Sequence, residues 1–232
     1  MEKKSKAIPY FSPSEMKDHS QEIFEKYKST STKILEHSVF SDTLKTFFSS
    51  DRNILDLGSA NGKIFNLLHS LGFNHTMGAD ISRYLSVGEP KEGFSEFDFS
   101  KDMFPFPDAS VDAITSVEVI EHLENIFHFF RECHRVLKQD GVMIFTTPNP
   151  YHIYNKFSFF KNGEYYRFLE GNDHITFLHN ALMRNAIKKY FSVEGLRFMD
   201  PELGYGKFSF LHRFLPNNKF FGRSVLFILR KR

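Results

Sequence analysis

The chain has 232 residues, of which 41% are hydrophobic and 25% charged, and its formal net charge is +2. This length and composition are typical of one globular domain. A net charge so close to zero gives the chain no overall electrostatic attraction to nucleic acid. The chain has no apolar run of membrane-spanning length and no signal-peptide core. Its single cysteine, Cys133, cannot form an intrachain disulfide, so we expect a cytoplasmic protein with a buried, inert thiol.

The first part of the chain is predicted to be helical. Residues 1–13 carry two prolines and are expected to be irregular, and from residue 14 to about 48 apolar residues recur at roughly helical spacing. We expect residues 1–48 to form a helical lid on the substrate side. Residues 49–232 should form the core of the same single domain.

Short apolar stretches alternate with helical segments from residue 53 onward. Strands are predicted at 53–58, 75–82, 94–100, 111–120, 141–149, 192–200 and 224–231, and helices at 63–72, 125–139 and 179–191. This alternation predicts an α/β fold with a doubly wound, mostly parallel, Rossmann-like sheet covered by helices on both faces. In such sheets the ligand binds beyond the carboxyl ends of the strands.

The first predicted strand runs into a glycine-containing turn, DLGSANG, over residues 56–62. Gly58 and Gly62 allow a sharp bend and a close approach to a ligand. The spacing is not that of a dinucleotide loop, which would need glycine where Ala60 and Lys63 stand. Asp56 lies two residues before the first glycine, and a carboxylate there favours a cationic cofactor over a pyrophosphate.

Two further acids lie at the ends of the second and third predicted strands. An acid about twenty residues past a glycine loop commonly accepts hydrogen bonds from ribose hydroxyls, which is the role expected for Asp80. Asp98 could accept from an adenine amino group, and Phe99 could pack on the base. Each acid alone could simply start a loop or cap a helix, but acids at three successive strand ends form a specific pattern.

The segments DLGSANG, GADIS, FDFS, FPFPDASVDAITSVEVIEHL and RVLKQDGVMIFTTPN resemble class I S-adenosylmethionine-dependent methyltransferases over roughly residues 50–200. They are similar in particular to the bacterial group that includes ubiquinone-biosynthesis O-methyltransferase-like enzymes. The resemblance implies an enzyme with S-adenosylmethionine as cofactor and a seven-stranded sheet whose last strand, here SVLFILRK, is antiparallel. The implied cofactor-binding residues are Asp56, Gly58, Ser59, Ala60, Gly62, Asp80, Ile81, Asp98, Phe99, Ser116, Val117 and Glu118. Many members have glycine where this chain has Ala60.

Catalysis is predicted to involve Glu121 and His122, which follow the fourth strand. A hydroxyl acceptor benefits from a general base, and the intrinsic pKa of His122 suits that role. The alternative is that His122 caps a helix or orders the loop.

A metal-binding interpretation competes for the same residues. Glu118, Glu121, His122 and His174 resemble the metal quartet of small-RNA 3′-terminal 2′-O-methyltransferases. That family has an aromatic-acid-tryptophan segment after the second histidine, whereas this chain has HITFLHN and no tryptophan. We therefore expect no metal, and a metal-dependent RNA 2′-O-methyltransferase is kept as an alternative function.

One further segment is expected to cover the substrate besides the N-terminal helices, and the basic C-terminal segment has two possible roles. Residues 151–174 are rich in aromatics, and we expect a loop that forms a ligand wall or lid, or that packs as a satellite cluster. Residues 207–232 combine seven basic residues with phenylalanines, which indicates either contact with an anionic surface or a β-connection with solvated charges. The expected acceptor is a small molecule or a glycan- or lipid-linked precursor, methylated at oxygen or nitrogen. A non-catalytic cofactor-binding scaffold is the second alternative.

Overall fold

The structure is a computed structural model and describes residues 33–168, 174–202 and 214–232. The helix predicted to begin near residue 14 therefore lies outside the described residues until Lys33. Within the described ranges no helix has both the length and the apolar character needed to cross a membrane.

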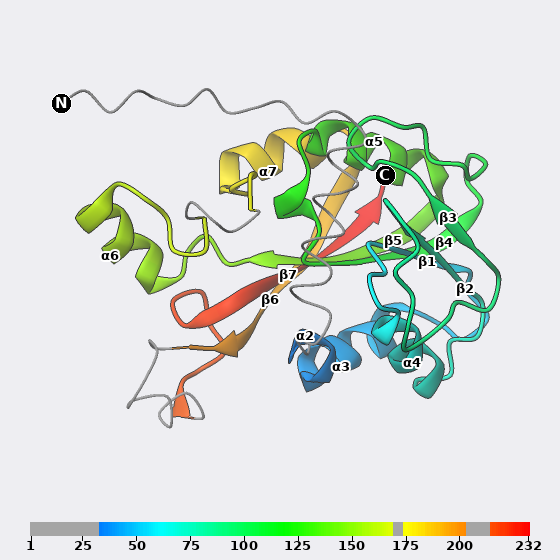
Figure 1. Cartoon of the computed structure of the whole chain (residues 1–232), viewed down its shortest axis with the longest axis horizontal. Helices are drawn as coiled ribbons and strands as arrows, with labels where there is room; N and C mark the ends of the chain where they lie inside the picture. Colours follow the sequence, from blue (N-terminus) through cyan, green and yellow to red (C-terminus); the bar gives the residue numbers. More distant parts are fainter. Residues whose placement is uncertain (1–32, 169–173, 203–213) are drawn as a thin grey trace.

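Seven strands form one sheet in the order β3-β2-β1-β4-β5-β7-β6 (Figure 1). They are β1 (Ile54–Leu57), β2 (Thr76–Asp80), β3 (Phe94–Glu96), β4 (Val111–Val117), β5 (Leu137–Pro148), β6 (Phe191–Pro201) and β7 (Gly222–Lys231). The first five pair in parallel, and β7 is antiparallel to both β5 and β6. The predicted doubly wound sheet with an antiparallel last strand is confirmed.

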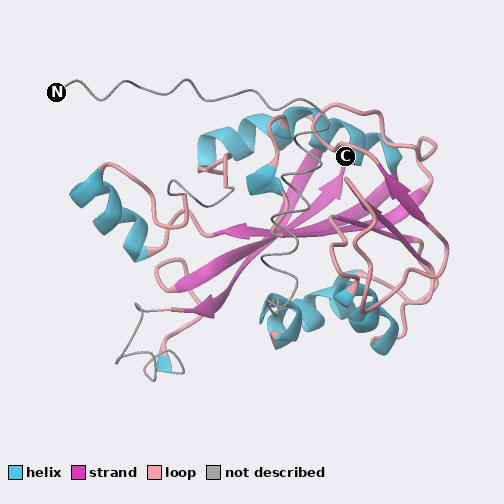
Figure 2. Cartoon of the chain, viewed as in Figure 1, coloured by secondary structure: helices cyan, strands magenta, loops and turns pink. Residues whose placement is uncertain are grey.

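Helices cover both faces of the sheet (Figure 2). The helices α2 (Lys33–Glu36), α3 (Ser38–Phe47) and α4 (Lys63–Ser70) lie on one face, and α5 (Ile126–Val136) and α7 (Asn180–Ile187) lie on the other. All four residues of β1 are buried, as expected for a central parallel strand with helices on both sides.

Each face has its own apolar cluster. Phe129, Phe130 and Cys133 of α5 pack in one cluster, whereas Phe40 and Leu44 of α3 belong to the other. The helix α3 is thus part of the core. Burial raises the pKa of the Cys133 thiol well above its usual value, so the thiol is inert, as predicted.

Several predicted elements differ from the structure. Strand β3 ends at Glu96 and not at residue 100, and the helix predicted at 125–139 ends at Val136, where β5 begins. Residues 153–162 form a helix, α6 (Ile153–Asn162), where the sequence analysis expected only an aromatic loop. The ring of His152 accepts a hydrogen bond from the Tyr154 N–H at its start, and Gly163 ends it with a φ of 74°. Strand β4 ends at Val117 and not at residue 120, because Glu118 takes a left-handed φ of 53° and the chain enters a 3-10 turn, η1 (Ile120–His122).

Candidate active site

The candidate site lies at the carboxyl ends of the central strands β1, β2 and β4. A small recess opens there to solvent. We call it the glycine-loop recess; it is lined by Leu35, Asp56, Gly58, Ser59, Ala60, Asn61, Lys63, Ile64 and Val117. Its position matches the general rule for ligands in open α/β sheets.

The turn after β1 has room for glycine alone at its two ends. Both Gly58 and Gly62 have a φ of 85°. A Cβ on Gly58 would lie 2.2 Å from Cγ2 of Val119, and a Cβ on Gly62 would lie 1.9 Å from the carbonyl oxygen of Gly88. These contacts explain physically why the sequence carries glycine at these positions.

Ala60, which departs from the family pattern, takes a left-handed φ of 45°. Its backbone N–H donates to Oδ2 of Asp80 at 2.9 Å, and this bond helps hold the strained residue. The loop therefore keeps its shape without a third glycine.

Asp56, the acid of the turn, is buried, with 2% of its surface exposed. Its Oδ1 accepts a hydrogen bond from the Thr115 hydroxyl at 2.6 Å, while its Oδ2 has no hydrogen-bond partner among the described residues. Burial raises the pKa of Asp56 to about 7, and the hydrogen bond from Thr115 opposes the rise. A buried acceptor without a partner fits the ammonium of a cationic cofactor, which would both bind and ionise it.

Asp80 lies at the end of β2 and holds the turn in place. Its two oxygens accept the backbone N–H groups of Ala60 and Ile81, at 2.9 and 2.8 Å. Burial raises its pKa to about 6, and these two bonds oppose the rise. Carboxylate oxygens accept more than one hydrogen bond each, so the ribose contact predicted for Asp80 and Ile81 stays a prediction.

Asp98 and Phe99 are engaged within their own segment. Oδ1 of Asp98 accepts from the Ser100 N–H at 2.8 Å, and Oδ2 pairs with Nζ of Lys101 at 2.9 Å. The ring of Phe99 is buried against Phe97. The predicted adenine contacts of Asp98 and Phe99 therefore stay predictions.

The end of β4 forms the floor next to the turn. Val117 lines the recess, and the buried Ser116 hydroxyl has no hydrogen-bond partner within the described ranges. The Glu118 N–H donates to both the carbonyl and the hydroxyl oxygen of Thr146, which fixes the left-handed residue. Oε2 of Glu118 lies 3.3 Å from the guanidinium of Arg167.

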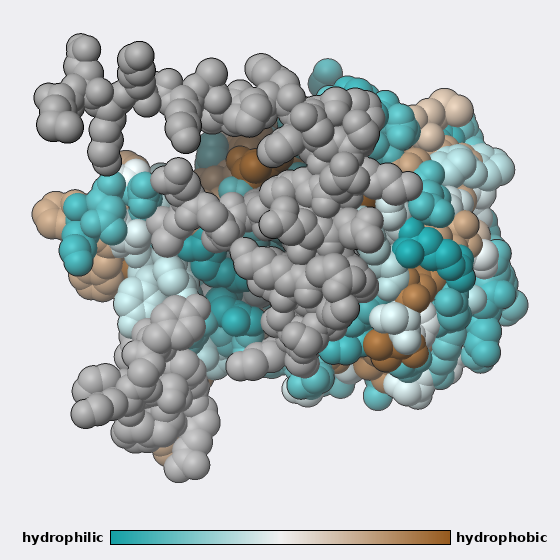
Figure 3. All heavy atoms as spheres, in the orientation of Figure 1, coloured by the Kyte–Doolittle hydropathy of each residue, from teal (hydrophilic) through white to brown (hydrophobic). Residues whose placement is uncertain are grey.

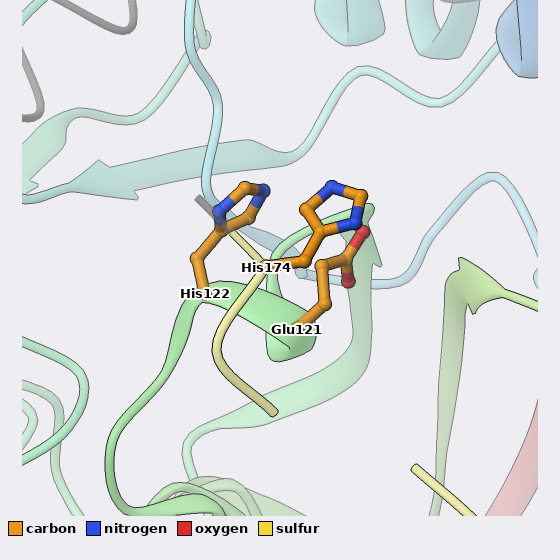
Figure 4. A group of neighbouring side chains, drawn as sticks. All are labelled: Glu121, His122 and His174. Atoms are coloured by element: carbon orange, nitrogen blue, oxygen red, sulfur yellow. The ribbon is translucent and has the colours of Figure 1, made fainter. Parts of the chain in front are cut away.

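Glu121, His122 and His174 lie together just beyond this floor (Figure 4). Each contributes one potential ligand atom, and these atoms all lie within 4.8 Å of one another. Glu121 is fully buried, and burial, followed by the charge of Glu118, raises its pKa well above the usual value. Burial lowers the pKa of His174 to about 3, so its ring is neutral.

The structure brings together three residues of the sequence-derived quartet and pairs the fourth, Glu118, with Arg167. Arg167 was not predicted from the sequence, because it lies far from Glu118 in the chain and belongs to no motif. Also not predicted were Leu35, Asn61, Lys63 and Ile64 of the recess lining. Two of these were within reach of sequence reasoning, since Asn61 and Lys63 lie in or next to the glycine turn.

The basic segment at residues 207–232 lies partly outside the described residues, including Lys207 and Arg213. Among its described members, Arg223 pairs with Asp200, and Arg230 pairs with Glu194. Lys231 donates to the carbonyl oxygen of Leu137. The contact with an anionic surface expected of this segment stays a prediction.

Comparison with known proteins matches residues 55–145 to the methyltransferase domain family. The chain is 33% identical over 106 residues to a Mycobacterium tuberculosis protein named a probable S-adenosylmethionine-dependent methyltransferase, which covers 42% of this chain and 36% of that protein. It is 30% identical over 129 residues to an uncharacterized protein of Methanocaldococcus jannaschii, covering 55% and 47%. The matched part thus spans less than half the length of these relatives.

Solved structures share the fold over nearly the whole chain. A S-adenosylmethionine-dependent methyltransferase from Archaeoglobus fulgidus has a TM-score of 0.60 at 17% identity, covering 93% of this chain and all of that one. A chain from the complex between the Haloferax volcanii Trm112 methyltransferase activator and a methyltransferase has a TM-score of 0.65 at 18% identity, covering 92% and 96%. Residues 55–145 thus match a methyltransferase domain, and the solved methyltransferase structures share the fold of this chain.

Proposed function

We propose that this protein transfers a methyl group from S-adenosylmethionine to an oxygen or nitrogen of a small-molecule or glycan- or lipid-linked acceptor. The observation that carries the proposal is the buried Asp56 carboxylate, whose Oδ2 lacks a partner among the described residues and which lines the glycine-loop recess. A cytoplasmic location, favoured by the buried single cysteine, is part of the proposal.

The bound cofactor supplies a methyl group on a positively charged sulfur, which is already a good leaving group. The chain's own task is then mainly binding and alignment. Asp56 would accept a hydrogen bond from the cofactor's ammonium, and Gly58 and Gly62 keep the turn open for close approach. Asp80 holds the turn through Ala60 and Ile81.

The acceptor is expected to meet the cofactor near Glu121 and His122. His122 is half-buried, and its ring lies edge-on to the ring of His174, with centroids 4.9 Å apart. The role of His122 as general base, with Glu121 beside it, remains a prediction.

Exposed aromatics on α6 support an acceptor with an apolar part. Phe157, Phe159 and Phe160 are exposed, and Phe160 has 92% of its surface accessible. Apolar and hydrophilic side chains lie side by side over α6 at the left of the molecule (Figure 3). Lys156 and Lys219 lie over the ring of Phe220 beside this helix. Apolar rings beside lysines suit an anionic, lipid-linked substrate or the surface that carries it.

The alternative of RNA 2′-O-methylation has one observation in its favour, the clustering of Glu121, His122 and His174. It predicts methylated RNA, whereas the main proposal predicts methylated small molecules or lipid extracts.

The test begins with titration of the full chain with S-adenosylhomocysteine by calorimetry. We expect saturable binding that weakens in Asp56→Asn and is unchanged in Asp42→Asn, an exposed acid on α3. Labelled S-adenosylmethionine is then added with fractionated cell extract. Label in the small-molecule or lipid fraction supports the proposal, label in RNA supports the alternative, and no cofactor binding at all contradicts both.

A further inference from the structure

We propose that Glu121, His122 and His174 bind a divalent transition-metal ion at the acceptor end of the site. The role of the ion next to the acceptor rests on the proposed function. The existence of the ion site depends only on these three side chains. The proposal replaces the base role predicted for His122 and Glu121 with that of metal ligands.

The geometry suits an ion with little rearrangement. The side chains of Glu121 and His122, from η1, and of His174, from the segment before α7, project to the same side (Figure 4). Their ligand atoms lie within 4.8 Å of one another. Ligands about 2.1 Å from an ion in tetrahedral geometry lie about 3.4 Å apart, so side-chain movements of about 1 Å would close the site.

An independent observation is the state of the Glu121 carboxylate. Glu121 is 0% exposed, and neither of its oxygens has a hydrogen-bond partner among the described residues. Burying a carboxylate without a partner is costly, and a coordinated cation removes that cost. The guanidinium of Arg167 pairs with Glu118 at 3.3 Å, and its charge also acts on Glu121. Two carboxyl groups thus share one guanidinium, which leaves room for a second cation.

Backbone hydrogen bonds hold the two ligand-bearing segments together in the absence of metal. The carbonyl oxygen of Glu121 accepts the N–H groups of Ile175 and Thr176, at 2.8 and 2.9 Å. The Thr176 hydroxyl donates to the carbonyl oxygen of Leu123 at 2.6 Å. These bonds join the residues on both sides of His122 to the residues just after His174, so the site is preorganised.

The donor set indicates both the ion and the acceptor. Two imidazoles and one carboxylate suit Zn²⁺, Mn²⁺ or Fe²⁺ better than Ca²⁺ or Mg²⁺. Three protein ligands leave coordination positions open, which oxygen atoms of the acceptor could fill. A coordinated hydroxyl loses its proton to solvent more readily, which favours an acceptor methylated at oxygen. Val117 of the glycine-loop recess precedes Glu121 by one short turn, so the ion would lie beside the cofactor.

The test uses the full chain, freed of any polyhistidine tag and treated with chelator, titrated with MnCl₂ by electron paramagnetic resonance and with ZnCl₂ by calorimetry. We expect one bound ion per chain. Glu121→Gln and His174→Gln should weaken binding more than about tenfold. The matched controls Glu124→Gln and His179→Gln, both exposed, should bind as the wild type does.

Binding equal in the wild type and in Glu121→Gln, or no binding to the wild type, overturns the proposal. If Glu121→Gln does not unfold cooperatively, the half-buried His122→Gln takes its place with the same expectation. Titration of metal-free protein with S-adenosylhomocysteine separates the two proposals. If that ligand binds and the metal does not, the metal site alone is contradicted. If the metal binds and that ligand does not, the proposed function alone is contradicted.

Discussion

The cofactor side and the acceptor side of the site differ in how their residues are held. On the cofactor side, Asp56, Gly58 and Asp80 come from two neighbouring strand ends, and short backbone hydrogen bonds fix them. On the acceptor side, Glu118 and Glu121 follow β4, whereas Arg167 and His174 come from a segment distant in the chain. The two segments meet through side chains and a few loop contacts. The cofactor site is thus built from neighbouring strand ends, whereas the acceptor site depends on long-range assembly.

The largest expected effect would come from closing the turn on the cofactor side. Gly58→Val should abolish S-adenosylhomocysteine binding, because its Cβ would lie 2.2 Å from Val119 and the residue would be held at a φ of 85°. Loss of the ligand-induced rise in melting temperature measures this. Gly72→Val is the matched control, since Gly72 has a φ of 89° with nothing within 4 Å. Equal effects of both variants on ligand binding would contradict the close-approach argument.

The next effect concerns the buried acid of the same turn. Because the folded-state pKa of Asp56, about 7, lies above its usual 3.8, the folded protein keeps this proton from about pH 4 to about pH 7. The carboxyl therefore lowers the free energy of unfolding as the pH rises through that window, and the loss is complete above pH 7. Asp56→Asn should stabilise the cofactor-free protein by about 2–4 kcal/mol at pH 8 and little at pH 4.

Urea unfolding at both pH values checks this, with Asp42→Asn as the control. The same Asp56→Asn variant should bind S-adenosylhomocysteine about 1–3 kcal/mol more weakly, the usual range for a lost polar contact. If Asp56→Asn changes the free energy of unfolding by the same amount at pH 4 and at pH 8, Asp56 is not desolvated in the folded protein.

Removing the Asp80 carboxylate should have a smaller effect, divided between the stability of the fold and the affinity for the ligand. Asp80→Ala leaves the N–H groups of Ala60 and Ile81 without their acceptor, which we expect to cost about 1–3 kcal/mol in ligand affinity. Asp80→Asn keeps one acceptor oxygen and should recover part of the affinity. Calorimetry on both variants measures the difference; full affinity in Asp80→Ala would place ribose recognition elsewhere.

The smallest effect on stability is expected on the acceptor side. Phe160→Ser on α6 should change the free energy of unfolding by less than about 0.5 kcal/mol, because this ring is exposed. It should nevertheless reduce co-sedimentation with phosphatidylglycerol vesicles. Phe127→Ser, an exposed phenylalanine on α5, is the control. Unchanged vesicle binding in Phe160→Ser would remove α6 from the proposed acceptor surface.

The amino-acid sequence by itself determined the elements that depend on local pattern. Short apolar stretches predicted the seven strands, because strands buried on both faces of a sheet consist mostly of apolar residues. Apolar residues at helical spacing predicted the helices α4, α5 and α7. The glycine turn and Asp56 were predictable for a similar reason, since a sharp turn restricts residue type at fixed positions.

Only the tertiary structure decided how the acceptor side is assembled. The helix α6 was missed because its phenylalanines point outward and show no buried face, and its limits are set by His152 and Gly163. Arg167 meets Glu118, and His174 meets Glu121 and His122, through packing of loops onto η1. Contacts between segments so distant in sequence leave no periodic signal, because they depend on how the whole chain brings its loops to one edge of the sheet.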